Sequence, residues 1–363
     1  MHRLPAALLP ASTLLAALLL AGCAATGPTG SPGTDPTPGA TPAGSAAGGA
    51  GATPSVPGDA GAGGGGPCAT LPEPGAEIDG WPAPGMISTT GVYPVIVSSE
   101  LACGENRLVF TFLDAANEPQ ASPDRRAAVA IYALGRDPAT PTAQVEATFA
   151  WAIEGERGLY VAPVSFDAAG VWGADFATVG PDGTTERIRV RFDVKIDGSA
   201  VRVDEPAPSV TTPTLADVGG DVARISTDTE PRPEFYETSV DEALDAGEPF
   251  LLVFATPAFC ASAQCGPLLD TVKAAADEVP DLTVINVEPY RLAWVDGRLQ
   301  PDLDASGALQ VVDAVRSYGM LTEPWIYVVD ADGYVAGSFE GIATVDELVE
   351  AMEEVLADAE AVE

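Results

Sequence analysis

Polar and apolar residues alternate along several short stretches between Gly91 and Val203, and this alternation predicts β-strands. It is clearest from Arg187 to Val194, where arginine and aspartate side chains occupy every second position and apolar side chains lie between them. A period of two is typical of a strand with one face in water and one face in a core. The same pattern predicts six further strands, at Val92–Val97, Leu108–Leu113, Ala127–Leu134, Val145–Ile153, Leu159–Phe166 and Val171–Val179.

Turn signals separate these strands at short and regular distances, for example Asp114–Asn117 and Pro181–Gly183. About seven short strands within roughly 110 residues are typical of an immunoglobulin-like sandwich. We therefore expect residues 67–203 to form an all-β domain of that kind. The stretch Tyr160–Phe176 also resembles small sandwich modules of bacterial envelope proteins, and this resemblance implies no catalytic residue.

The hydrophobic pattern changes twice after Val203. Residues 204–234 are rich in Pro, Thr and Asp without a steady period, which predicts a linker. Residues 235–363 then alternate between helix and strand patterns. Capping boxes at Ser239–Glu242 and Thr344–Glu347 each open a predicted helix, and a further helix ends at Glu278. Apolar runs suited to buried strands are Pro249–Ala255, Leu282–Val287, Trp325–Val329 and Tyr334–Phe339.

The first 22 residues have the parts of a secretory signal: a short basic start, an apolar stretch to Leu20 and small residues before Cys23. The run Leu20-Ala21-Gly22-Cys23 resembles the lipobox of bacterial lipoproteins. The resemblance implies cleavage before Cys23 and acylation of that cysteine, for example with palmitate, which would anchor the chain to the extracytoplasmic face of the cell membrane. An ordinary signal peptide and an uncleaved anchor are the alternatives, and both still export the chain.

Residues 23–66 follow the signal and consist almost wholly of Gly, Ala, Pro, Thr and Ser. This composition has no apolar period that could build a core, so we expect a tether. Every later apolar run is broken by charge, Gly or Pro before it reaches the roughly 18 to 20 residues that span a bilayer. Membrane contact is therefore expected through the lipid anchor only.

The formal net charge of −36 arises from 53 acidic and 17 basic residues. Such a chain would be repelled by nucleic acid and by anionic lipid surfaces. We interpret the charge as a solubilising surface of an exported protein rather than a cation site.

The only histidine, His2, lies in the signal, so the exported chain contains none. This excludes Ser-His-Asp and Cys-His catalysis, and zinc or haem sites that use histidine. We expect no cofactor and no metal, which leaves thiol, carboxylate or pure binding chemistry.

Two cysteines, Cys260 and Cys265, lie between a predicted buried strand and a predicted helix, and Pro324 directly precedes a later strand. This order resembles the thioredoxin family over about residues 236–357. The resemblance implies an α/β thioredoxin-like fold after the sandwich, a redox pair at Cys260 and Cys265, and a cis-proline at Pro324 facing that pair. It also makes Cys260 the attacking thiol and Cys265 the resolving one. The nearby helix N-terminus would lower the pKa of the Cys265 thiol, however, and this favours Cys265 as the attacking thiol.

The sequence departs from that family in its C-x4-C spacing and in Phe259, which stands where the family has Trp. The pair is therefore open to other interpretations: a static disulfide, or a metal site of the copper-delivering type, which lacks its histidine here. A peroxidase would place Thr three residues before its cysteine and Pro before that Thr. Thr256 is four residues before Cys260 and Pro257 follows it, so the spacing does not fit.

Cys68 and Cys103 are the remaining cysteines. An exported chain with an even number of non-lipidated cysteines favours a disulfide between them, with two separate thiols as the alternative. Two functions stay open: a membrane-anchored thiol-disulfide oxidoreductase that acts on protein thiols or disulfides of the envelope, and a non-enzymatic envelope lipoprotein that binds a protein partner.

Overall fold

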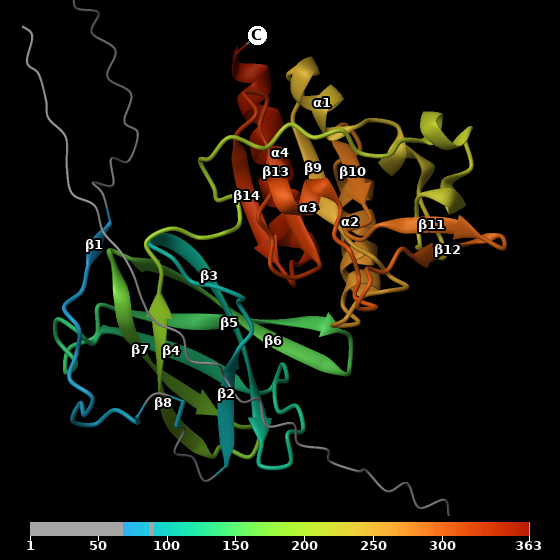
Figure 1. The fold of residues 1–363 in the computed structure, drawn as a ribbon. Helices are drawn as coiled ribbons and strands as arrows, with labels where there is room; N and C mark the ends of the chain where they lie inside the picture. The colour runs from blue at the N-terminus through green and yellow to red at the C-terminus, as the bar shows by residue number, and fades with distance from the viewer. Residues whose placement is uncertain (1–67, 84, 87–90, 363) are drawn as a thin grey trace, which may run out of the picture. The chain divides into compact units, whose positions relative to one another are not determined.

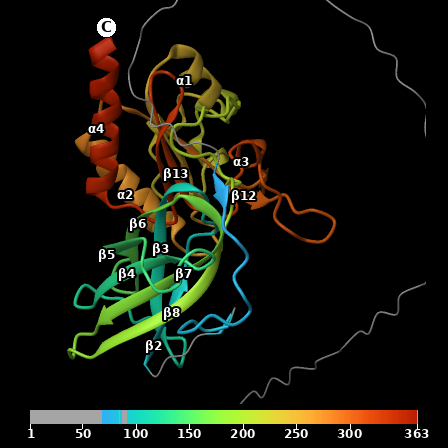
Figure 2. The same cartoon turned by 90° about the vertical axis from the view of Figure 1, so that its left-hand side faces the viewer.

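The computed structural model describes residues 68–83, 85–86 and 91–362. The predicted signal peptide, the lipidation site Cys23 and the predicted tether 23–66 lie outside the described residues. All described residues fall within one compact unit, Ala62–Glu363. Two views of this unit are given in Figures 1 and 2.

Eight strands between Ala69 and Val194 form one sheet (Figure 1). The seven strands predicted from alternation are all present, with ends that differ by a few residues. The strands are β1 (Ala69–Thr70), β2 (Val92–Ile96), β3 (Gly104–Asp114), β4 (Arg126–Ala133), β5 (Ala143–Ile153), β6 (Arg157–Phe166), β7 (Ala168–Val179) and β8 (Thr185–Val194).

The long strand β5 joins two groups of strands that would otherwise be separate. Its first residues, 143–147, pair with β4, and residues 148–153 pair with β6. The order is β1-β7-β4-β5-β6-β3-β2, with β8 beside β7. The sheet curls until β8 approaches β2, where the Val92 amide donates to both carboxylate oxygens of Glu186 at 3.3 and 3.4 Å. A single curled sheet thus encloses the core of this part.

Aromatic rings fill the space inside the curled sheet. Phe110, Phe112, Tyr160 and Phe176 are all buried there. The ring centroids of Phe110 lie 4.7 Å from Phe176 and 5.5 Å from Tyr160, which is the usual separation of packed aromatic pairs. The Tyr160 hydroxyl donates to the Arg125 carbonyl at 2.9 Å, so its polar end is satisfied.

A second, four-stranded sheet lies in the C-terminal part, in the order β10-β9-β13-β14. Strands β9 (Phe250–Phe254) and β10 (Thr283–Val287) are parallel, and β13 (Trp325–Val329) is antiparallel to β9 and to β14 (Val335–Glu340). Every residue of β9 and β13 is buried. Burial of both faces explains why these segments are continuous apolar runs rather than alternating ones.

Four α-helices cover the two faces of this sheet. Helices α2 (Cys265–Glu278) and α4 (Val345–Val362) contribute to one apolar cluster, and α1 (Val240–Ala246) and α3 (Asp313–Ser317) contribute to the other. The predicted capping box is formed at α4, where the Thr344 amide donates to the Glu347 carboxylate at 2.9 Å and the Glu347 amide donates to the Thr344 hydroxyl at 3.2 Å.

Residues 204–234, which composition predicts as a linker, are bonded to the four-stranded sheet. The Asp204 amide donates to the Val335 carbonyl and the Ala207 amide to the Gly333 carbonyl, each at 2.9 Å. Three short 3-10 helices begin in this stretch: η1 (Leu215–Val218), η2 (Val222–Arg224) and η3 (Pro233–Tyr236). A segment without periodicity can still satisfy its backbone groups against a neighbour, which composition does not reveal.

A hairpin that the sequence analysis did not predict extends from the C-terminal part between β10 and α3 (Figures 1 and 2). It consists of β11 (Leu292–Val295) and β12 (Arg298–Pro301). The two residues between the strands, Asp296 and Gly297, have φ values of 51° and 78°. Positive φ at both positions is typical of the type I′ turn that joins two antiparallel strands tightly.

The two sheets are connected by side chains. Arg107 of β3 forms a 2.6 Å salt bridge with Glu347 of α4 and donates to the Ile342 carbonyl at 2.8 Å. The Ser99 amide donates to the Glu340 carboxylate at 3.0 Å. Ile342 is buried in an apolar cluster with Val109 and other residues of the large sheet.

The observed sheets and the contacts between them differ from the expected fold class. The prediction of an immunoglobulin-like sandwich followed by an α/β thioredoxin-like fold is wrong. The described residues are mostly β and include four α-helices. Their N-terminal part forms one curled eight-stranded sheet instead of two stacked sheets, and no separate thioredoxin-like domain is shown. Alternation correctly predicts single strands but not their pairing, and it gave no sign that β5 would pair on both sides or that Arg107 would bind Glu347.

Candidate functional site around the Cys260–Cys265 disulfide

Cys260 and Cys265 are joined by a disulfide in the loop between β9 and α2. Their Cα atoms are 6.0 Å apart, so the four intervening residues still allow the bond. Cys265 is the first residue of α2 and is fully buried, whereas Cys260 is half-buried. Only Cys260 is therefore open to a reagent from solvent.

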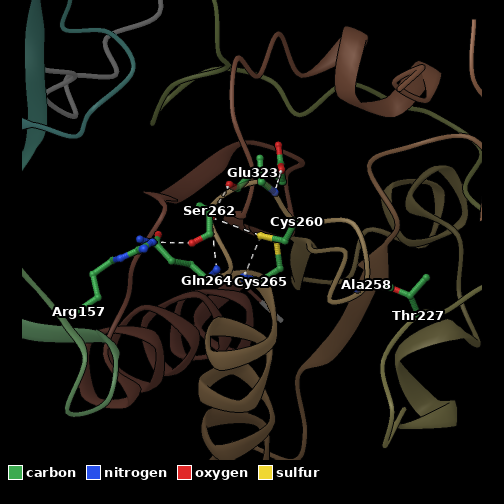
Figure 3. The surroundings of a disulfide bond; sticks show 9 residues. Arg157, Thr227, Ala258, Cys260, Ser262, Gln264, Cys265 and Glu323 are labelled. Atoms are coloured by element: carbon green, nitrogen blue, oxygen red, sulfur yellow. Dashed lines mark hydrogen bonds between the residues drawn. A yellow bond between two sulfur atoms is a disulfide. The ribbon is translucent and has the colours of Figure 1, made fainter. Parts of the chain in front are cut away.

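Two donors surround the Cys260 sulfur (Figure 3). The Cys265 amide donates to the Cys260 Sγ at 3.2 Å, and the Ser262 hydroxyl lies 3.3 Å from the same atom. The Ser262 hydroxyl also accepts from the Gln264 amide at 3.3 Å. Backbone and side-chain groups of the loop thus fix the position of the half-exposed sulfur.

Pro324 and its neighbour Glu323 contact this loop. The Glu323–Pro324 peptide bond is cis, as the sequence analysis expected, and Pro324 is buried. The Glu323 carboxylate accepts from the Ala261 amide at 3.1 Å (Figure 3). The structure thus brings the Glu323–Pro324 segment, which includes the third predicted site residue, against the cysteine loop. A carboxylate beside a cysteine disfavours the thiolate form of that cysteine.

The large sheet also contacts the cysteine loop. Arg157, the first residue of β6, donates from Nη1 to the Ser262 carbonyl at 2.6 Å (Figure 3). This bond joins residues 105 positions apart in the sequence. Arg157 could not be identified from the sequence, since a long-range contact of one exposed side chain leaves no local pattern.

A polar cluster around the buried Glu288 lies on the other side of the loop. The Glu288 carboxylate accepts from the Thr227 amide at 2.6 Å. The Thr227 hydroxyl accepts from the Ala258 amide at 3.2 Å, and both of these residues are labelled in Figure 3. Burial raises the pKa of the Glu288 carboxyl above its ordinary range. This cluster was missed, although the position of Glu288 directly after the apolar run Leu282–Val287 was a visible signal.

Tyr236 connects this region to strand β10. Its hydroxyl donates to the Ser226 hydroxyl at 2.7 Å and accepts from the Asn286 side-chain amide at 2.5 Å. Burial raises the pKa of Tyr236 to about 12, so the phenol stays protonated at neutral pH. The Tyr236 network therefore holds Ser226 by hydrogen bonds between neutral groups.

An open pocket of about 540 Å³ adjoins the cysteine loop and the hairpin. Phe259 and Trp294 supply its aromatic walls, and the residues of β12 line one side. The remaining lining comes from Ala223, residues 226–228, Ala258 and residues 297–301. The pocket does not include either cysteine, so it is a site beside the disulfide rather than around it.

Cys68 and Cys103 form a second disulfide, with Cα atoms 6.2 Å apart. It connects the chain just before β1 to the start of β3. The predicted lipidation site Cys23 cannot be placed, because it lies outside the described residues.

The described residues contain no group of three or more His, Cys, Asp or Glu side chains that could hold a metal ion. Among the same residues, no helix combines the length and apolar character that a membrane crossing needs.

Comparisons with known proteins give little similarity. No protein-family model matches the chain, and no curated protein matches it. Among solved structures, the soluble domain of PmoD from Methylocystis sp. is 15% identical, with 30% of this chain and 96% of that chain covered and a TM-score of 0.20. The Lin-41 filamin domain is 14% identical, with 30% and 100% covered and a TM-score of 0.18. Similarities this low carry no argument about fold or function.

Proposed function

We propose that the protein is a non-enzymatic, lipid-anchored protein of the extracytoplasmic face that binds a protein partner, with Cys260–Cys265 as a structural disulfide. The observation that carries the proposal is the restraint on the cysteine loop. Its amide at Ala261 is bound by Glu323, its carbonyl at Ser262 is bound by Arg157, and the Cys265 side chain is fully buried. A catalytic disulfide must open and close, whereas this loop is held from two sides.

The lipid anchor belongs to the same proposal. The Leu20–Cys23 sequence and the Gly- and Pro-rich residues 23–66 would hold the protein at the membrane surface through acyl chains on Cys23. The extreme negative charge supports binding to a protein rather than to nucleic acid or anionic lipid, since both of those are repelled.

A redox titration tests the structural role of the disulfide. The full chain is equilibrated in buffers of graded potential, free thiols are alkylated, and each cysteine is read by peptide mass spectrometry. A structural disulfide stays bonded to below about −300 mV. We expect this result for Cys260–Cys265 and for Cys68–Cys103, and the second pair serves as the internal reference.

Thiol-disulfide exchange is the second candidate function, and the half-exposed Cys260 sulfur with its two hydrogen-bond donors favours it. Those donors would stabilise a Cys260 thiolate after reduction. If Cys260 and Cys265 titrate together between about −120 and −270 mV while Cys68 and Cys103 stay bonded, exchange chemistry replaces the structural role.

A further inference from the structure

The β11–β12 hairpin exposes more apolar surface than a surface hairpin needs. Trp294 is 38% exposed and Val295 42% exposed, and Leu303 and Leu309 beyond the hairpin are also exposed. Exposed large apolar side chains are a feature of many interaction sites. Trp294 is the one that also lines the 540 Å³ pocket.

The edge of β12 offers backbone hydrogen bonds along this pocket. Val295 and Arg298 flank the two-residue turn and face each other, as do Trp294 and Leu299. In an antiparallel pair of strands, residue pairs alternate along the ladder. One pair exchanges backbone hydrogen bonds, and in the next pair the N–H and C=O groups point away from the partner strand. With Val295 and Arg298 bonded across the turn, the Leu299 amide and carbonyl point to the outer edge. Among the described strands, β12 pairs only with β11, and η2 packs nearby.

Two exposed arginines lie at the pocket of this acidic protein. Only two lining residues are charged, Asp228 and Arg298. Asp228 forms a 2.6 Å salt bridge with Lys273, which also pairs with Asp270 at 3.2 Å, whereas Arg298 forms no salt bridge among the described residues. The Arg224 guanidinium lies 5.9 Å from the Trp294 ring centroid and likewise has no salt bridge there. Two uncompensated guanidinium groups thus flank Trp294 in a chain of net charge −36.

We propose that the groove between β12 and residues 226–228 and 258–259 binds an extended acidic peptide segment of a protein partner. The segment pairs with the Leu299 backbone as an added strand. It places an apolar side chain between Phe259 and Trp294, and its carboxylates meet Arg298 and Arg224. Strand addition supplies affinity through main-chain bonds, and the pocket and the two cations supply selectivity. This inference rests on the proposed function, because it names the surface and the kind of partner for that binding role.

Selection from a random heptapeptide display library tests this assignment. The immobilised full chain is the bait, and the retained peptides are sequenced and synthesised. We expect enrichment of Asp and Glu together with one aromatic or aliphatic residue. Affinity should fall at least about tenfold for Arg298→Glu and for Trp294→Ala, as for anchoring residues of an interface. Arg316→Glu, an exposed arginine on α3, is the matched control and should bind as the wild type does.

Strand pairing is tested with the same peptides after N-methylation at alternate residues, which removes backbone donors. Loss of binding for one methylation register alone is expected. The assignment is overturned if no peptide is retained, if retained peptides lack acidic residues, or if Arg298→Glu leaves their affinity unchanged. These outcomes are distinct from failure of the proposed function, which the redox titration of Cys260 and Cys265 decides independently of any peptide.

Discussion

Arg157 of the eight-stranded sheet donates a 2.6 Å hydrogen bond to the carbonyl of Ser262, which lies between the two bonded cysteines. The backbone within the disulfide loop is therefore held by a residue from the other sheet. Since Glu323 holds the adjacent Ala261 amide at 3.1 Å, the loop is fixed at two consecutive residues. This arrangement makes the accessibility of the disulfide depend on contact between the sheets.

Arg157→Ala should make the Cys260–Cys265 disulfide easier to reduce. Loss of one hydrogen bond weakens the closed loop by about 0.5–1 kcal/mol, which corresponds to a rate of reduction by dithiothreitol about two- to fivefold higher. Global stability should change little, because Arg157 is exposed. Arg136→Ala, which removes an exposed salt bridge to Asp167, is the control. Equal reduction rates for both variants would show that the Arg157 bond does not restrain the loop.

The two disulfides should differ in their contribution to stability. The Cys68–Cys103 bond spans 35 residues and the Cys260–Cys265 bond spans 5. Loop entropy then predicts losses of about 4 kcal/mol for the Cys68→Ala, Cys103→Ala double variant and about 2 kcal/mol for the Cys260→Ala, Cys265→Ala double variant. Urea unfolding under oxidising conditions measures both. An unchanged midpoint for the second double variant would contradict a structural role for Cys260–Cys265.

The Arg107–Glu347 ion pair should make the contact between the sheets sensitive to acid. Burial acts to raise the pKa of Glu347, but the charge and hydrogen bonds of Arg107 and the capping bonds of Thr344 outweigh it and lower that pKa. A lowered folded-state pKa means that the carboxylate contributes stability above its ordinary pKa, and that this contribution is lost as the pH falls through the lowered value.

Glu347→Gln removes the charge while keeping a residue that suits the capping box. Because the Glu347 side chain is 35% exposed, we expect a loss of only about 0.5 kcal/mol at neutral pH. Urea unfolding as a function of pH should show the variant and the wild type converging in acid. A difference that persists after protonation of Glu347 would assign the loss to packing instead of charge.

Local patterns predicted single elements well and their arrangement poorly. Arg187–Val194 and the buried run of β9 could be identified because each pattern reports the environment of its own residues. The pairing of β5 with both β4 and β6 depends on residues far away in the sequence, so alternation could not show it. The β11–β12 hairpin had a readable signal, the Asp296-Gly297 pair, which is typical of a two-residue hairpin turn.

The same distinction applies to the candidate site. Cys260, Cys265 and Pro324 could be identified because cysteines and an isolated proline next to strands are conspicuous. Arg157 and Thr227 could not, since the side chain of each bonds to a backbone group that only the fold brings near. The spacing of Cys260 and Cys265 shows only that the two thiols can form a disulfide. The contacts of the loop between them show how firmly it is held, and they favour a structural disulfide over a redox pair.

If Cys23 carries the proposed lipid anchor, Cys23→Ala should abolish membrane attachment. Without an acylated cysteine, no covalent lipid holds the chain, and we expect label from radioactive palmitate to be lost and the protein to enter the soluble fraction. Thr26→Ala, three residues away, is the control and should remain labelled and membrane-bound. Membrane retention of the Cys23→Ala protein would point to an uncleaved signal segment as the anchor.

The contact between Glu186 and Val92 has a consequence for the order in which the large sheet opens. There, β8 meets β2 through a carboxylate instead of a full ladder of backbone bonds, so the curled sheet has a seam. The free energy needed to separate β2 from β8 should therefore be lower than that needed to break the continuous ladders of β7 with β4 and β8. In hydrogen exchange, amides along β2 should therefore lose protection before those of β7, and unfolding of this part should begin at the seam.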